Sequence, residues 1–261
     1  MLRSLNELRD YTLLARDGDL GRCKDFLFDD QRWTIRFMVA DTGSWLAGKK
    51  VLISPVSLEE PDWDSGRIPV ALTKEEIEKA PLLLEHEPVS RRHEARLFTH
   101  YGWPSYWTGP ALWGPVAVPS LLAEQARAQK QSSQRPSEEE SEDLHLRSVN
   151  EVTRYDIEAT DGSLGKVDDL IVQDELWIVR YMIIDTHRWL PGRRVIISPG
   201  WVEQVSWSGQ RVKLNLSREQ IKQSPVYDPS MPVNREYEQR LYDFYGRPVY
   251  WTRSEHMETN A

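Results

Sequence analysis

Short runs of apolar residues follow one another along the first part of the chain, and the same order of runs returns in the second part. Residues 34–40 are apolar and rich in β-branched side chains, which predicts a central strand, and residues 178–184 repeat this run. The neighbouring runs predict about six short strands in each part at close spacing. This pattern favours a small β-barrel or sandwich over a helical fold.

Helical signals come only after the strands. Residues 73–76 and 217–220 are capping boxes, in which Thr or Ser is followed three residues later by Glu or Gln. Residues 91–101 and 235–245 have the spacing of longer amphipathic helices, and each is followed by a glycine that can end the helix. The expected fold class is therefore mainly β with appended helices.

The two parts are copies of each other. Leu2-Arg3-Ser4 recurs as Leu146-Arg147-Ser148, and the copies then align without a gap as far as Trp107 and Trp251. Such self-similarity indicates a tandem duplication. We divide the chain into copy 1 (1–107), a linker (108–145) and copy 2 (146–252). The linker begins Gly/Pro-rich, carries a possible short helix over 120–130, and ends polar and acidic.

Two glycines in each copy have a predicted role. Asp17-Gly18 and Asp161-Gly162 predict hairpin turns, because glycine tolerates a positive φ. Gly21 and Gly165 follow three residues later and indicate a bulge or a close backbone approach.

These motifs together resemble the PRC-barrel domain. In copy 2 they are the segments DGSLGKVDD (161–169), RYMIIDT (180–186) and GRRVIISP (192–199). Copy 1 shows the same order with Asp17-Gly18, Gly21, Asp41-Thr42, Trp45-Leu46 and VLISP at 51–55. The resemblance covers about residues 2–80 and 146–224. It implies two small β-barrels in tandem, used for docking.

The PRC-barrel family includes the cytoplasmic domain of the H subunit of purple-bacterial photosynthetic reaction centres and a domain of a ribosome-maturation factor. We expect neither the membrane helix of the H subunit nor a separate RNA-processing domain ahead of the barrel in this protein. The resemblance therefore implies a binding module and gives no reaction type, since a fold does not by itself fix a function.

Composition narrows the functional classes. The chain has 261 residues, 39% hydrophobic and 28% charged, which is typical of a folded soluble protein. Its net charge of −8 argues against direct nucleic-acid binding, which needs a basic face. A single Cys23 excludes an intrachain disulfide, and no apolar window is long enough to span a membrane. We expect a cytoplasmic protein, for which peripheral docking on a membrane complex stays open.

No arrangement of residues predicts catalysis, a cofactor or a metal site. His86, His93 and His100 are spaced by seven, but copy 2 keeps none of them. Cys23 corresponds to Val167 and is interpreted as a small buried hydrophobe. The repeated acids are interpreted as structural, because most sit in turns or at strand ends; they are Asp25, Asp30, Asp41, Asp169, Asp174 and Asp185.

Repeated aromatic residues and arginines are the candidate docking or inter-copy packing residues. They are Trp45, Tyr101, Tyr106, Trp107, Trp189, Tyr245, Tyr250, Trp251, Arg36 and Arg180. Trp, Tyr and Arg dominate interface hot spots, but large aromatics also cover cores. We predict that the Tyr-Trp pairs pin the terminal helices to a barrel. The two arginines stand in apolar strands, where we expect an acid partner or stacking on a Trp.

The leading functional hypothesis is a non-enzymatic binding or scaffold protein with protein partners. One alternative is an accessory protein of a photosynthetic or electron-transfer membrane complex. Another is an RNA-processing or ribosome-assembly factor that docks on protein. An enzyme would need a pocket lined by converging polar groups. Two homologous copies can also pack about a pseudo-two-fold axis, as in an isologous dimer.

Overall fold

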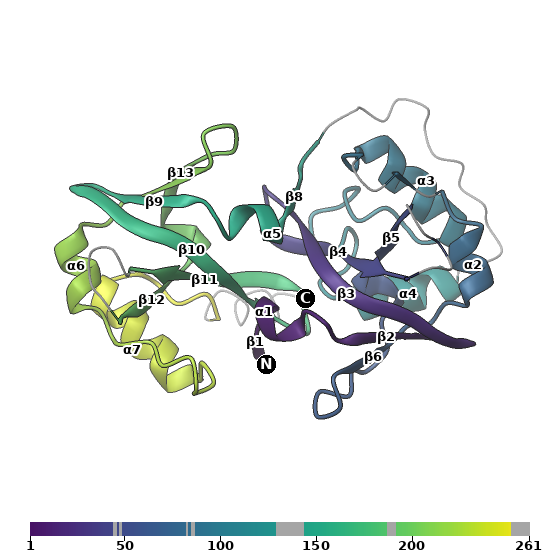
Figure 1. The fold of residues 1–261 in the computed structure, drawn as a ribbon, viewed down its shortest axis with the longest axis horizontal. Helices are drawn as coiled ribbons and strands as arrows, with labels where there is room; N and C mark the ends of the chain where they lie inside the picture. The colour runs from purple at the N-terminus through teal and green to yellow at the C-terminus, as the bar shows by residue number, and fades with distance from the viewer. Residues whose placement is uncertain are drawn as a thin grey trace. The chain divides into compact units, whose positions relative to one another are not determined.

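The computed structural model of the chain describes residues 1–43, 46, 49–81, 83–84, 87–128, 144–186 and 192–251 (Figure 1). The chain forms two compact units. Unit 1 contains residues 3–152 and 172–179 together with Met1, and unit 2 contains residues 153–171 and 180–261 together with Leu2. The units therefore do not coincide with the two copies, because unit 1 takes in the beginning of copy 2.

Unit 1 is a sheet of short strands with helices packed beside it. Its elements are β1 (Leu2–Ser4), α1 (Leu5–Leu8), β2 (Thr12–Ala15), β3 (Gly18–Asp29), β4 (Thr34–Asp41), β5 (Lys49–Ile53), the 3-10 turn η1 (Pro55–Ser57), β6 (Arg67–Pro69), α2 (Lys74–Glu78), β7 (Leu83–Leu84), α3 (Arg91–Tyr101), α4 (Pro119–Ala128), β8 (Leu146–Ser148) and α5 (Val149–Val152).

The central ladder of unit 1 pairs β3 with β4 in antiparallel fashion. On one side β2 pairs antiparallel with β3, and β6 adds to β2 in parallel. On the other side β5 pairs with β4, and β7 pairs with β5. Phe26, Phe37 and Met38 are fully buried, so the middle of this ladder forms the core. Phe98 of α3 packs edge-on against Phe37, which fixes the helix to the sheet.

Unit 2 repeats this arrangement. Its elements are β9 (Asp156–Ala159), β10 (Gly162–Gln173), β11 (Ile178–Asp185), β12 (Arg194–Ile197), the 3-10 turn η2 (Pro199–Trp201), β13 (Val202–Ser206), β14 (Arg211–Leu214), α6 (Arg218–Gln223) and α7 (Arg235–Tyr245). The last two residues of β10 (172–173) and the first two of β11 (178–179) belong to unit 1. β9 pairs antiparallel with β10, and β14 adds to β9 in parallel, as β6 adds to β2.

Equivalent elements begin 144 residues apart, or 145 for β5 and β12, so the repeated sequence forms the same order of elements twice. The two long helices cover 91–101 and 235–245, as predicted, and each ends at a left-handed glycine. Both predicted capping boxes are formed. The sequence also predicts a strand at residues 58–63. That prediction is wrong, because Leu58 and Asp62 make only isolated bridges there, whereas copy 2 forms β13 at the matching place.

Gly21 has the close backbone approach that the sequence predicted. Its φ is +128°, and a Cβ on it would overlap the carbonyl oxygen of Asp41. Gly165 repeats this relation with Asp185. The strand register shifts beside both glycines, so each one marks a β-bulge.

The fold class is mainly β with appended helices, as expected. The strand pairings in the described residues form an open path and do not close into a barrel. None of the helices in the described ranges combines the length and the apolar character that a membrane crossing needs.

Unit 1 holds together the beginnings of both copies. Strand β8 of copy 2 pairs antiparallel with the end of β3. Arg147 Nε donates to Asp30 at 2.8 Å, and Arg3 Nε donates to Asp174 at 2.8 Å. These two ion pairs are the same pair with the copies exchanged, which is the pattern of an isologous contact. Packing of the whole copies about a pseudo-two-fold axis stays a prediction.

Candidate arginine-aromatic sites

A buried arginine lies at the centre of the site in copy 1. Arg36 stands in β4 and has no exposed surface. Its Nε and Nη2 donate to Asp29 Oδ2 at 3.1 and 2.7 Å, and its Nη1 donates to the carbonyl oxygen of Leu112 at 2.9 Å. A buried charge needs such partners, because losing water costs several kcal/mol per ion. The predicted acid partner of Arg36 is therefore Asp29.

The charge of Arg36 lowers the pKa of its partner, Asp29. Burial by itself would raise the pKa of Asp29, but the Arg36 guanidinium outweighs it, with help from backbone N–H groups. Gln31 and Arg32 supply those N–H groups, at 3.0 and 2.7 Å from Asp29 Oδ1. The pKa of Asp29 is held below its usual range, so the pair is ionised at neutral pH.

The Tyr-Trp pair of copy 1 lies on this arginine. The guanidinium of Arg36 sits 3.9 Å from the centre of the Tyr106 ring, which is a cation–π contact. The Tyr106 hydroxyl donates to Glu94 Oε2 at 2.5 Å and accepts from Arg91 Nη1 at 2.8 Å. Trp107 packs on Phe98 of α3, with ring centres 5.5 Å apart. The pair thus fastens α3 to the central strand.

Local sequence places the helix residues of the site. Ser90 caps α3, and this fixes where the helix begins. Arg91 and Glu94 then lie one turn apart on the same face, 3.3 Å from each other. Glu94 is fully buried and also lies 3.1 Å from His145 Nε2. Burial and the charge of Glu94 raise the pKa of Tyr106 well above its usual value, so its hydroxyl stays protonated.

Residues 109–117, which we call the Trp113 cap, cover the arginine of copy 1. Trp113 has no exposed surface, and its ring centre is 4.7 Å from the Arg36 guanidinium. Its Nε1 donates to the carbonyl oxygen of Leu176 at 3.0 Å. The cap is a tight turn, in which Ala111 bridges to Gly114. The start of the linker is therefore packed against unit 1.

Copy 2 builds the same site in unit 2. The Arg180 guanidinium lies 3.8 Å from the centre of the Tyr250 ring. Glu238 Oε1 accepts from Tyr250 at 2.8 Å and from Tyr181 at 2.7 Å, while Arg235 lies 3.0 Å from Glu238 Oε2. Burial raises the pKa of Tyr250 to about 12, with a further contribution from the Glu238 charge. We call Arg36, Arg91, Glu94, Tyr106 and Trp107 cluster 1, and Arg180, Arg235, Glu238, Tyr250 and Trp251 cluster 2.

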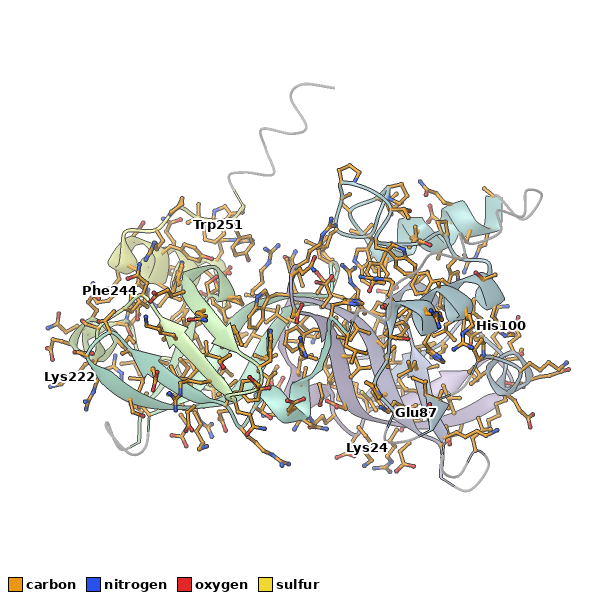
Figure 2. All side chains as sticks on the ribbon, turned by 90° about the horizontal axis from the view of Figure 1, so that it is seen from above. Lys24, Glu87, His100, Lys222, Phe244 and Trp251 are labelled. Carbon is orange, nitrogen blue, oxygen red and sulfur yellow. The ribbon has the colours of Figure 1, made fainter. Side chains whose placement is uncertain are left out.

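The two clusters differ in exposure. Arg36 and Tyr106 are buried, whereas Arg180 and Tyr250 are only half-buried. The Arg91 side chain is 16% exposed, and its counterpart Arg235 is 57% exposed. In Figure 2, Trp251 lies where the described chain of copy 2 ends. Arg180, Tyr250 and Arg235 are thus more exposed than their counterparts in cluster 1, whereas Glu238 is buried like Glu94 and Trp251 is half-buried like Trp107.

Sequence differences match this contrast. The cap residues Leu112-Trp113-Gly114-Pro115 correspond to His256-Met257-Glu258-Thr259, which lie outside the described residues. Asp29, which neutralises Arg36, corresponds to Gln173. Copy 2 therefore keeps the arginine and the tyrosine but carries neither the capping tryptophan nor the acid in sequence.

The other predicted site residues lie elsewhere. Tyr101 stacks on Trp103 with ring centres 4.5 Å apart and lines a groove of about 600 Å³ with residues of α2 and α4. Tyr245 packs on Trp201 at 4.8 Å. Trp45 and Trp189 lie outside the described residues.

Sequence reasoning missed five residues of the site in copy 1, which are Asp29, Arg91, Glu94, Trp113 and His145. Glu94 could have been found, because its counterpart is also a glutamate, placed three residues after an arginine in both helices. Trp113 corresponds to Met257 and His145 to Met1, so the comparison of copies gave neither of them weight.

Other potentially reactive side chains are buried or hydrogen-bonded within the fold. Cys23 is buried, as expected, and burial raises the pKa of its thiol. His93 is buried in α3, and burial together with nearby Arg96 lowers its pKa to about 4. Asp25 accepts from the Ser148 hydroxyl at 2.6 Å. Within the ranges that the structure describes, no group of three or more His, Cys, Asp or Glu side chains could hold a metal ion.

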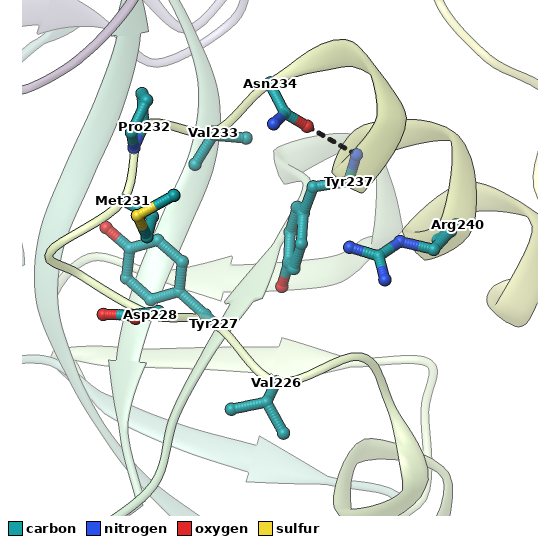
Figure 3. A pocket seen from close by; sticks show the side chains of 9 residues that line it. All are labelled: Val226, Tyr227, Asp228, Met231, Pro232, Val233, Asn234, Tyr237 and Arg240. Atoms are coloured by element: carbon teal, nitrogen blue, oxygen red, sulfur yellow. Dashed lines mark hydrogen bonds between the residues drawn. The ribbon is translucent and has the colours of Figure 1, made fainter.

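Figure 3 shows a small hollow between α6 and α7. It measures about 210 Å³ and is lined by residues that include Tyr227, Met231 and Tyr237. Its polar groups serve the loop itself: Asn234 Oδ1 accepts from the Tyr237 backbone at 2.9 Å, and Asp228 accepts from Ser230. Pockets for small ligands usually measure about 300–1,000 Å³, so this one is smaller.

A scan of the chain against protein-family models finds no match, and a search of curated proteins finds no significant relative. The resemblance to the PRC-barrel domain therefore stays a proposal.

Proposed function

We propose that this protein is a non-enzymatic docking protein built from two PRC-barrel-like modules, and that cluster 2 is its docking surface. One observation carries the proposal: the stacked arginine and tyrosine are buried in copy 1 and half-buried in copy 2. A surface that combines Arg, Tyr and Trp has the composition of an interface hot spot. The PRC-barrel part of the proposal is supported by the repeated bulge glycines, Gly21 and Gly165, which take the same close backbone approach.

The chemistry of cluster 2 supports binding better than turnover. Glu238 accepts hydrogen bonds from Tyr250 and Tyr181 and is paired with Arg235. These bonds occupy the carboxylate, so its role is to hold the aromatic residues in place. The faces of Tyr250 and Trp251 and the exposed part of Arg235 are then preorganised, which lowers the cost of binding a partner.

The test compares two matched arginines. The tagged full chain captures proteins from the lysate of its own cells, either unchanged, as Arg235→Ala, or as Arg91→Ala. Arg235 is the more exposed of the two, so its replacement should leave the fold intact, which circular dichroism checks. We expect at least one protein that Arg235→Ala loses and Arg91→Ala retains. An identical captured set for all three baits would contradict the proposal.

A further inference from the structure

The linker helix α4 forms one wall of a groove in unit 1, which we call the α4 groove. Its other walls come from η1, from α2 and from the end of α3. Leu122 and Ala126 of α4 are buried, so an apolar face holds the helix against the unit. The groove measures about 600 Å³, which lies in the size range of sites for small molecules.

Two arginines bring positive charge to the α4 groove. Arg16 directly follows β2 and Arg127 stands in the last turn of α4, and both side chains are exposed. Neither guanidinium has a hydrogen bond, an ion pair or a ring contact with any residue that the structure describes. The carboxylates at the groove are engaged, because Glu75 pairs with Lys79 and Glu76 closes the capping box of α2. An anion that enters the groove therefore meets two unpaired guanidinium groups.

An aromatic pair supplies the flat, apolar part of the α4 groove. Tyr101 and Trp103 stack with ring centres 4.5 Å apart, and Phe98 packs edge-on against Trp103 at 5.4 Å. Burial, together with the charge of Glu76, raises the pKa of Tyr101, so its hydroxyl stays protonated. This hydroxyl has no hydrogen-bond partner among the described residues and can therefore donate to an oxygen of a ligand.

The comparison of the two copies separates these groups from the shared scaffold. Arg16 corresponds to Thr160 and Trp103 to Arg247, and α4 belongs to the linker. Copy 2 forms the same order of strands and helices without them, so the common fold does not require them. A ligand that only copy 1 binds accounts for all three.

We infer that the α4 groove binds a small aromatic carboxylate, whose ring lies against Trp103 and whose carboxylate is held by Arg16 and Arg127. A guanidinium binds a carboxylate through charge-assisted, often paired hydrogen bonds, and flat aromatic surfaces favour one another once they leave water. The groove is a different site from cluster 2, so this inference does not depend on the docking function.

The experiment titrates the full chain with cinnamate by isothermal calorimetry and uses cinnamamide as the uncharged match of the same shape. We expect one cinnamate site per chain and binding of the amide that is at least about tenfold weaker, because the amide carries no charge for the arginines. Arg16→Ala and Arg127→Ala should each weaken cinnamate binding about tenfold. Arg96→Ala is the matched control, because Arg96 is exposed on α3 but does not line the groove.

Replacements of Trp103 test the aromatic half of the site. Trp103→Phe keeps a ring and should retain most of the binding, whereas Trp103→Ala should lose it. Circular dichroism checks that each variant is folded, and the arginine variants decide the question if Trp103→Ala does not fold. Cinnamate that binds Trp103→Ala as tightly as the unchanged chain overturns the inference.

Other results would also overturn it. One is the absence of binding at about 1 mM cinnamate, and another is equal affinity for cinnamamide, which would show an apolar hollow only. Binding that is lost in Arg235→Ala and kept in Arg16→Ala places the site at cluster 2. Binding that appears only when residues 138–140 are changed from glutamate to glutamine assigns the two arginines to the chain's own acids.

Discussion

Replacing Trp113 with alanine tests how firmly the cap holds unit 1 together. Trp113 is fully buried, contacts the Tyr106 ring and the Arg36 guanidinium, and donates to the Leu176 carbonyl oxygen at 3.0 Å. Core replacements of tryptophan by alanine cost about 3–5 kcal/mol. The hydrogen bond accounts for about 1 kcal/mol of such a loss. We therefore expect Trp113→Ala to lower the free energy of unfolding by about 3–5 kcal/mol.

Urea denaturation followed by circular dichroism measures this change. The two compact units can unfold in separate transitions, so the data are fitted to two steps, and only one midpoint should move. Leu121→Ala is the matched control, because Leu121 stands in α4 close to the cap in sequence but is 44% exposed. It should change stability by less than about 0.5 kcal/mol. A loss below about 1 kcal/mol for Trp113→Ala would show that the cap lies loosely on the cluster, and the reasoning would fail.

Three further outcomes follow from single positions. Gly21→Ala should cost more than about 3 kcal/mol in urea denaturation, whereas Gly43→Ala, with open space around it, should cost about 1 kcal/mol; equal losses would contradict the close approach. Because burial lowers the pKa of His93 from about 6.5 to about 4, up to about 3 kcal/mol of stability present above pH 6.5 should be lost as the pH falls to 4, and His93→Gln should flatten that pH profile. Trp107→Ala and Trp251→Ala should each lower the thermal midpoint by an amount equivalent to about 1–3 kcal/mol, since both side chains are half-buried; unchanged midpoints would refute their packing role.

Local signals predicted the helices best. The helix at 91–101 agrees with the expected bounds at both ends, because Ser90 and Gly102 act within one turn of the chain. The strand expected at residues 58–63 failed for a reason that is not local. Its partner strand β6 stops at Pro69, a residue with no N–H to donate, so two isolated bridges, Leu58 to Val70 and Asp62 to Arg67, form in place of a ladder.

The sequence predicted the part of the site in which a charged side chain stands in an apolar strand and therefore needs a partner. An arginine in the apolar run of β4 had to find an acid or an aromatic ring, and Arg36 found both in Asp29 and Tyr106. The cap was not predictable in this way. A Gly/Pro-rich segment reads as a linker, and the burial of Trp113 depends on Leu176, far along the chain. The comparison of the two copies also gave no sign of a role for Trp113, because copy 2 has no tryptophan at that position.

The entry of β8 into unit 1 sets the order in which this protein can fold during synthesis. The end of β3 at Leu27–Asp29 stays an open strand edge until residues 146–148 leave the ribosome, and the acceptor of the Trp113 indole arrives only with Leu176. At about 5–20 residues per second, copy 1 waits several seconds after its own last residue before these partners exist. During that interval the nascent chain exposes a pairing edge, so a ribosome-bound chaperone or slow translation of copy 2 would change its yield more than its final stability.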